Sequence, residues 1–211
     1  MTAAQAEVQS GLDGKVPIPV SARGPATQDI TVRFGFWLFI LSDVIIFAAL
    51  FAAYAVLSHK TAGGPAGPAI FHKSRTIMET GCLLASTFTC GMMSFSVENR
   101  STSRIYLWGT ITFILGLLFI SLELWEFSTL IKDGAGPQRS AFLSAFFTLV
   151  GTHGLHVAAG LIWLFVMGLQ LFTFGLEAMV MRRFFCFALF WHALDIVWIA
   201  IFTIVYLGAG L

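Results

Sequence analysis

Residues 34–56 read FGFWLFILSDVIIFAALFAAYAV, a run of 23 residues with one acidic residue, Asp43, and no basic one. An α-helix rises about 1.5 Å per residue, so a helix of this length crosses the ~30 Å hydrocarbon core of a bilayer. The run is apolar on every helical face, which is typical of a segment surrounded by lipid. It therefore predicts a transmembrane helix over about residues 33–57.

Four more apolar runs follow, separated by charged or turn-forming links. Together the runs predict five transmembrane helices, at about residues 33–57, 77–97, 104–130, 142–173 and 184–208. No segment shows the alternation typical of membrane β-strands. The predicted fold class is therefore all-α, an integral membrane bundle of five helices. Residues 31–211 would form this domain. Residues 1–30, which are polar and contain no signal-peptide-like apolar segment, would form a mobile tail.

The composition narrows the range of functions. Hydrophobic residues make up 57% of the chain and charged residues 11%, against about 25% charged residues in soluble domains. The formal net charge is +1, so the chain lacks the basic excess by which proteins bind nucleic acid. All three cysteines lie in apolar runs, and we expect them to be small buried side chains rather than disulfide or metal ligands.

The ionisable residues within the runs are the informative ones, because a charge facing lipid costs roughly 2.5–3.5 kcal/mol. Three pairs are spaced three residues apart, so the two members of each pair share one helix face. These pairs are Glu123 with Glu126, His153 with His156, and His192 with Asp195. We expect them to converge as one hydrogen-bonded network between the last three helices. The indoles of Trp191 and Trp198 would cap the fifth-helix pair.

The fourth run contains a cluster of small residues. Small residues let transmembrane helices approach closely, so this cluster predicts a packing surface. Its members are Gly151, Gly154, Ala158 and Gly160.

Three classes of function fit these residues. A structural subunit would use the polar pairs to hold its helices together. A haem enzyme would need two facing histidines, for example His156 and His192, and a di-iron enzyme would need Glu-x-x-His pairs, which the sequence lacks. A proton or ion pathway would use Asp43 and Glu123 as relay groups.

Three stretches, in order along the chain, resemble subunit III of the haem–copper oxidases. They are LELWEF (122–127), GPQRSAFLSAFFTLVGTHGLHVAAGLIW (136–163) and FWHALDIVWIAIFTIVYL (190–207). The resemblance covers about residues 33–208. The five-helix form with a short polar tail is most similar to the bacterial cytochrome bo-type ubiquinol oxidase branch of the family. Five-helix cytochrome c oxidases are the alternative.

The resemblance implies a non-catalytic subunit of an H⁺-transporting ubiquinol oxidase of the respiratory chain. Haem and copper would belong to subunit I, and this chain would hold neither. It would stabilise subunit I and support its proton uptake. Subunits I, II and a small subunit IV are the implied partners, and structural phospholipid is the implied bound lipid. No catalytic, cofactor-binding or metal-binding residue is assigned.

In many members of the family, a glutamate that reacts with carbodiimide follows a serine in the first of these helices. Here Asp43 follows Ser42, which makes Asp43 the candidate proton-related carboxylate, one methylene shorter than the family's residue. The resemblance also implies a bacterial inner-membrane location, with the N-terminus in the cytoplasm and the C-terminus in the periplasm.

Overall fold

The computed structural model describes residues 28–63 and 73–208 of the 211-residue chain. Within these ranges the chain forms long helices and no strand. The helices are α2 (Gln28–Leu57), α4 (Lys73–Glu98), α5 (Thr102–Lys132), α6 (Ala141–Phe174) and α7 (Ala178–Ile201), which continues as the π-helix η2 (Phe202–Leu207). Five helices are long and apolar enough to cross a membrane. The predicted all-α membrane fold is confirmed.

Two helix starts differ from the expected ones. The first helix begins at Gln28, inside the stretch expected to be a tail, and residues 1–27 of that stretch lie outside the described residues. The second helix begins at Lys73, four residues before the expected start at residue 77, so Glu79 is its seventh residue. The chain divides into two compact units, after Trp37. All contacts described below belong to the second unit, which starts at Leu38.

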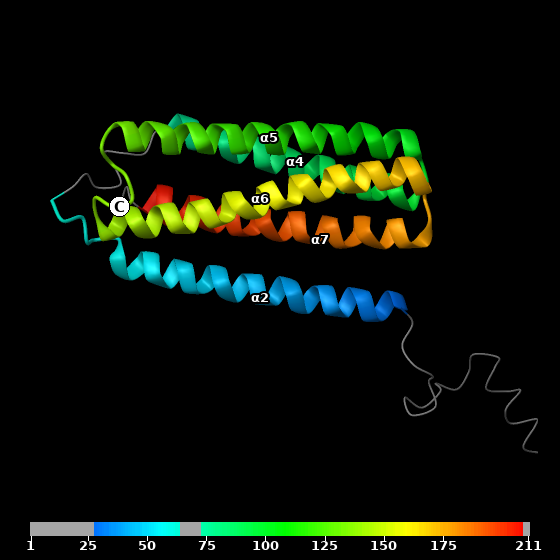
Figure 1. Ribbon diagram of the computed structural model, residues 1–211, viewed down its shortest axis with the longest axis horizontal. Coiled ribbons are helices and arrows are strands. Elements are labelled where there is room, and N and C mark those ends of the chain that lie inside the picture. The colour runs from blue at the N-terminus through cyan, green and yellow to red at the C-terminus, as the bar shows by residue number, and fades with distance from the viewer. Residues whose placement is uncertain (1–27, 64–72, 209–211) are drawn as a thin grey trace, which may run out of the picture. The chain divides into compact units, whose positions relative to one another are not determined.

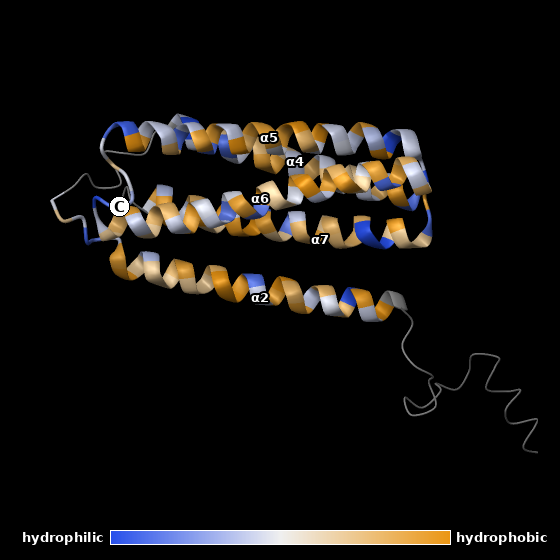
Figure 2. Cartoon of the chain, viewed as in Figure 1, coloured by the Kyte–Doolittle hydropathy of each residue, from blue (hydrophilic) through white to orange (hydrophobic). Residues whose placement is uncertain are grey.

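Four helices of this unit form a closed ring. Helix α4 packs against α5 and α7, and α6 packs against the same two helices on the other side (Figure 1). Apolar residues cover most of each helix (Figure 2). Many large apolar side chains point away from the ring, among them Leu155 (73% exposed) and Phe172 (83% exposed). A bilayer solvates such side chains, while the helical backbone satisfies its own hydrogen bonds.

A large buried indole holds the ring together at its centre. Trp191 of α7 is 1% exposed. A Cβ added at Gly160 would lie 2.9 Å from this indole, and one added at Gly116 would lie 3.0 Å from it. Gly116 of α5 and Gly160 of α6 therefore form a slot for the Trp191 indole, and a side chain at either position would fill it. Gly160, one of the predicted packing residues, serves this purpose.

Hydrogen bonds connect α4 to its two neighbours. Trp191 Nε1 donates to Ser86 Oγ, and Trp198 Nε1 donates to Thr80 Oγ1, each over 3.1 Å. The hydroxyls of Thr89 and Thr112 lie 2.8 Å apart and join α4 to α5. The expectation that both indoles cap His192 and Asp195 is wrong, because each indole projects across the ring to a hydroxyl of α4.

We predict that Gly160→Ala destabilises the bundle, because the added methyl would overlap the Trp191 ring. Overpacking of this kind costs about 1–3 kcal/mol. Gly168→Ala on the same helix is the matched control, because nothing lies within 4 Å of its added Cβ. Thermal unfolding in detergent should show a lower midpoint for Gly160→Ala alone. Equal midpoints for the two variants would contradict the slot.

Candidate functional site

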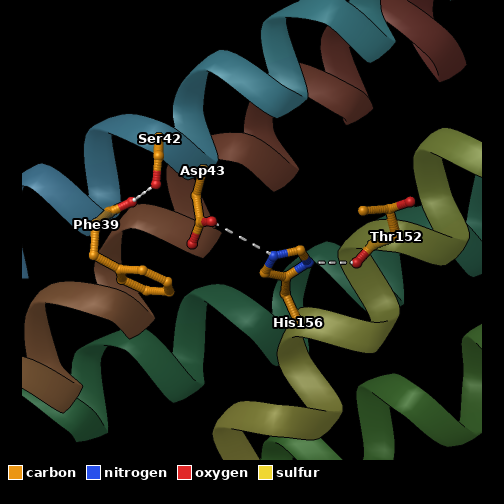
Figure 3. Close-up of polar contacts among 5 residues, drawn as sticks. All are labelled: Phe39, Ser42, Asp43, Thr152 and His156. Atoms are coloured by element: carbon orange, nitrogen blue, oxygen red, sulfur yellow. Dashed lines mark hydrogen bonds and ion pairs between the residues drawn. The ribbon is translucent and has the colours of Figure 1, made fainter.

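An acid–imidazole pair connects α2 to α6 within the second unit. Asp43 Oδ1 lies 4.0 Å from His156 Nε2, and the other ring nitrogen, Nδ1, lies 2.7 Å from the carbonyl oxygen of Thr152 (Figure 3). The Asp43 side chain is 16% exposed and that of His156 is 24% exposed. The two groups are therefore partly sheltered but still reachable from outside the chain.

The Thr152 carbonyl determines which ring nitrogen of His156 carries a hydrogen atom. A carbonyl oxygen only accepts hydrogen bonds, so His156 Nδ1 must carry hydrogen in order to bond to it. The nitrogen that faces Asp43 is therefore Nε2, and the carboxyl group and the imidazole lie opposite each other across 4.0 Å.

Aromatic rings surround the pair. The Phe47 ring lies 5.2 Å from the His156 ring, and the Phe190 ring lies 6.5 Å from it, between centroids. Phe47 itself is 2% exposed. These rings limit access to the imidazole from inside the bundle, so the pair opens outward.

His153 lies in a different environment, although it shares a helix face with His156. Its imidazole is fully buried, 5.2 Å from the Trp198 ring and 5.8 Å from the Phe119 ring. Among the described residues, neither of its ring nitrogens has a hydrogen-bond partner. Residues three apart on a helix differ by about 60° around its axis, since a turn takes 3.6 residues. That angle directs His153 into the ring and His156 toward α2.

The two glutamates of α5 face the ring interior. Glu126 Oε2 accepts a hydrogen bond from the Tyr206 hydroxyl over 3.2 Å. The Glu123 carboxyl lies against the backbone of Gly154, where an added Cβ would come within 2.5 Å of both oxygens. Glu79 of α4 lies within electrostatic range of both glutamates. Gly154 thus accommodates a carboxyl group as well as allowing close helix packing.

The pair on α7 turns toward α4. Asp195 interacts with His192 and lies beside Thr87. The predicted single network is therefore divided into three groups: an outer pair at His156, an inner carboxyl group at Glu123 and Glu126, and the α7 pair. The three groups are separate because each helix of the ring has two neighbours, and its polar residues point toward one or the other of them.

Sequence reasoning missed three contributors to these groups. Glu79 lies close to the expected start of the second helix at residue 77, and it was not assigned to the network. Thr87 had no distinguishing signal. Tyr206 is directed inward by the π-helix, which no sequence pattern indicated.

Nothing in the described ranges resembles a metal centre. No group of three or more His, Cys, Asp and Glu side chains there is arranged to hold a metal ion. His156 and His192, the two residues considered as haem ligands, interact with different carboxyl groups, those of Asp43 and Asp195.

An apolar groove of about 480 Å³ lies between α5 and α6, with Met93 of α4 and Phe184 of α7 at its sides. Within it, the Tyr106 hydroxyl donates to the Gly168 carbonyl oxygen over 3.2 Å. Gln170, which does not line the groove, accepts a 2.6 Å hydrogen bond at Oε1 from Arg183. The groove is therefore mainly apolar.

The sequence model of the cytochrome c oxidase subunit III family matches residues 21–209. Subunit 3 of cytochrome bo(3) ubiquinol oxidase from Pseudomonas aeruginosa is 51% identical over 84% of this chain and 85% of its own length. The protein of the same name from Buchnera aphidicola subsp. Baizongia pistaciae is 50% identical over 82% of this chain and 89% of its own. Cytochrome c oxidase subunit 3 of Bacillus sp. (strain PS3) is 41% identical over 90% and 92%.

These matches extend over all five helices and agree with the observed membrane fold. The chain therefore belongs to the cytochrome c oxidase subunit III family and is a multi-pass membrane subunit III of a bacterial terminal oxidase, where it assembles with other oxidase subunits.

Proposed function

We propose that the chain is subunit III of a proton-pumping ubiquinol oxidase, where it stabilises catalytic subunit I. The observation that supports this choice is that relatives at 51%, 50% and 49% identity are named as ubiquinol oxidase subunits. Others with that name are 43% and 42% identical, and one named as a cytochrome c oxidase subunit is 41% identical. The alternative donor is cytochrome c. Haem or metal chemistry within this chain is the alternative of another class.

The exposed face of α2 supports a role in assembly. From Leu38 onward this helix buries few side chains, among them Phe47 and Tyr54, while Ile45 (70% exposed) and Val56 (73% exposed) point away from the other helices. A helix attached by so few contacts gains stability from a further apolar neighbour. We infer that oxidase subunits I and II, and a small subunit IV, are the partners of this chain.

We further propose that the chain itself holds no haem or metal and that structural phospholipid is its non-protein partner. The groove beside Gly168 supports the second part of this proposal. Its volume lies within the range of about 300–1,000 Å³ typical of small-molecule sites, and its walls are mainly apolar. An acyl chain matches these features.

We propose that the Asp43–His156 pair is the proton-related site. The supporting observation is a carboxyl group and an imidazole that face each other across 4.0 Å in a partly exposed place. An unpaired charge at membrane depth is expensive, so a carboxyl group there is more stable beside a potential cation.

We propose an orientation with the N-terminus in the cytoplasm. An odd number of membrane spans places the two ends of the chain on opposite sides. In this orientation, seven of the twelve Lys and Arg residues lie on the same side of the membrane as the N-terminus, and positive residues favour the cytoplasm. The link after α2 and the C-terminus would then face the periplasm.

The first prediction of this function concerns the donor and the cofactors. The purified intact oxidase should oxidise ubiquinol and not cytochrome c. Oxidase prepared from cells that lack this chain should keep its haem absorption spectrum but lose activity faster during turnover, because support for subunit I is gone. Oxidation of cytochrome c alone would establish the alternative donor. Loss of a haem band would contradict the absence of a cofactor in this chain.

Asp43→Asn should leave assembly and the haem spectrum unchanged but shorten sustained turnover. Asparagine keeps the shape and can still donate toward His156, yet it has no exchangeable acid proton. Polar contacts between membrane helices average about 0.6 kcal/mol, so the loss of this one should have little effect on assembly, and the initial rate should stay close to that of the parent.

Ser42→Ala is the matched control, because Ser42 is adjacent on α2 and its hydroxyl bonds only to the carbonyl oxygen of Phe39 (Figure 3). It should behave like the parent. If Asp43→Asn also retained full sustained turnover, Asp43 would be a packing residue. An immediate loss of proton pumping in an assembled complex would show a direct catalytic role instead.

Reporter fusions test the orientation. Fusions after Lys60 and at residue 211 should both report the periplasm, because one follows the first span and the other the fifth. A fusion after Arg100, between α4 and α5, should report the cytoplasm and is the internal control. The reverse pattern at all three positions would invert the orientation.

A further inference from the structure

Three carboxyl groups meet in the part of the ring where α4 begins and α5 ends. Glu79 is the seventh residue of α4, and Glu126 lies six residues before the end of α5. Both are therefore about 9 Å from the helix ends, at 1.5 Å per residue. Glu123 is one turn deeper on α5. The proposed function assigns no role to this group.

All three side chains are buried. Glu79 is fully buried, Glu126 is 2% exposed and Glu123 is 3% exposed. They interact electrostatically: Glu79 with Glu126, and Glu123 with both. Within the described part of the chain, neither oxygen of Glu79 has a hydrogen-bond partner. A fully buried side chain with two unsatisfied oxygens, placed beside two other carboxyl groups, needs an explanation, and ordered water is the partner that buried polar groups commonly use.

The charged and titratable groups around the cluster come from each neighbouring element. Arg75 of α4 is the cation that acts on Glu79, and its guanidinium group also lies 4.4 Å from the Trp125 ring. The Tyr206 hydroxyl of η2 donates to Glu126. On α6, the backbone of Gly154 contacts Glu123, and His153 is the adjacent ionisable residue. The ionisable pair of α7, His192 and Asp195, lies beside Thr87 instead.

The π-helix at the end of α7 supports a specific role for this arrangement. π-helical turns are rare overall, and those that occur often lie at functional sites. Here the turn brings Tyr206, which is 5% exposed, within hydrogen-bond distance of Glu126. The same hydroxyl can accept a hydrogen bond as well as donate one, so Tyr206 can extend a chain of hydrogen bonds to bound water.

We propose that Glu79, Glu123 and Glu126 form a buried acid cluster that holds protons and bridging water. Three carboxylates that share one buried site repel one another, which favours the protonated form. One guanidinium group cannot neutralise three carboxylates, and each unneutralised buried ion costs several kcal/mol. Protons shared among the three groups remove the excess charge, and water molecules satisfy the free oxygens of Glu79. This site is separate from the Asp43–His156 pair and does not depend on the identity of the electron donor.

Infrared spectroscopy of the intact purified oxidase tests the proposal. Protonated carboxylic acids have a C=O stretch that carboxylates lack, and exchange into D₂O shifts it. At neutral pH, Glu79→Gln, Glu123→Gln and Glu126→Gln should each remove or shift part of this signal. Glu98→Gln, at the exposed end of α4, is the control and should leave it unchanged. If none of the three variants altered the signal, the cluster would be ionised and the proposal would be wrong.

Stability and a second variant keep the test independent of misfolding. Glutamine resembles a protonated glutamate, so Glu79→Gln should keep the thermal midpoint of the parent. If Glu79 were ionised in the parent, the substitution would remove the negative charge beside Arg75 and lower the midpoint. Tyr206→Phe keeps all three carboxyl groups but removes one hydrogen-bond donor, so it should shift the C=O frequency without loss of intensity. An unchanged frequency in an assembled Tyr206→Phe complex would overturn the proposed cluster.

Discussion

The structure depends on one constraint: hydrocarbon offers no hydrogen bonds to polar side chains, so the polar residues of α4 must be enclosed by protein. Helix α4 carries buried Thr80, Ser86 and Thr89. Indoles of α7 and a threonine of α5 satisfy these hydroxyls. Helix α4 is therefore fixed by both of its neighbours. Helix α6 packs against the same two neighbours and closes the ring, and the glycine slot around Trp191 determines how closely α5, α6 and α7 approach.

The ring produces two polar environments of different character. Glu79, Glu123 and Glu126 lie inside it, where burial is nearly complete. The Asp43–His156 pair lies outside it and is partly exposed. In the proposals above, the outer pair takes part in proton exchange and the inner cluster holds protons and water.

Much of the fold and part of the site could be predicted from the sequence. The lengths of the five apolar runs predicted five helices, because the membrane requires about 20 residues per span whatever the packing. The ionisable residues within the runs were recognised because each would be costly in lipid. Glu79 was underestimated, because the helix that contains it begins at Lys73, and a start one turn earlier changes a surface residue into a buried one.

The sequence by itself determined the membrane class, the number of spans, the family and the polar residues that had to be sheltered. Only the tertiary structure decided which of them meet. Spacing of three residues places two side chains about 60° apart on a helix, and that angle sends His153 into the ring and His156 toward Asp43. The direction of the Trp198 indole and the π-helical turn at Tyr206 depend on neighbours far along the chain. Local patterns carry no information about these contacts, because they arise only when the helices pack.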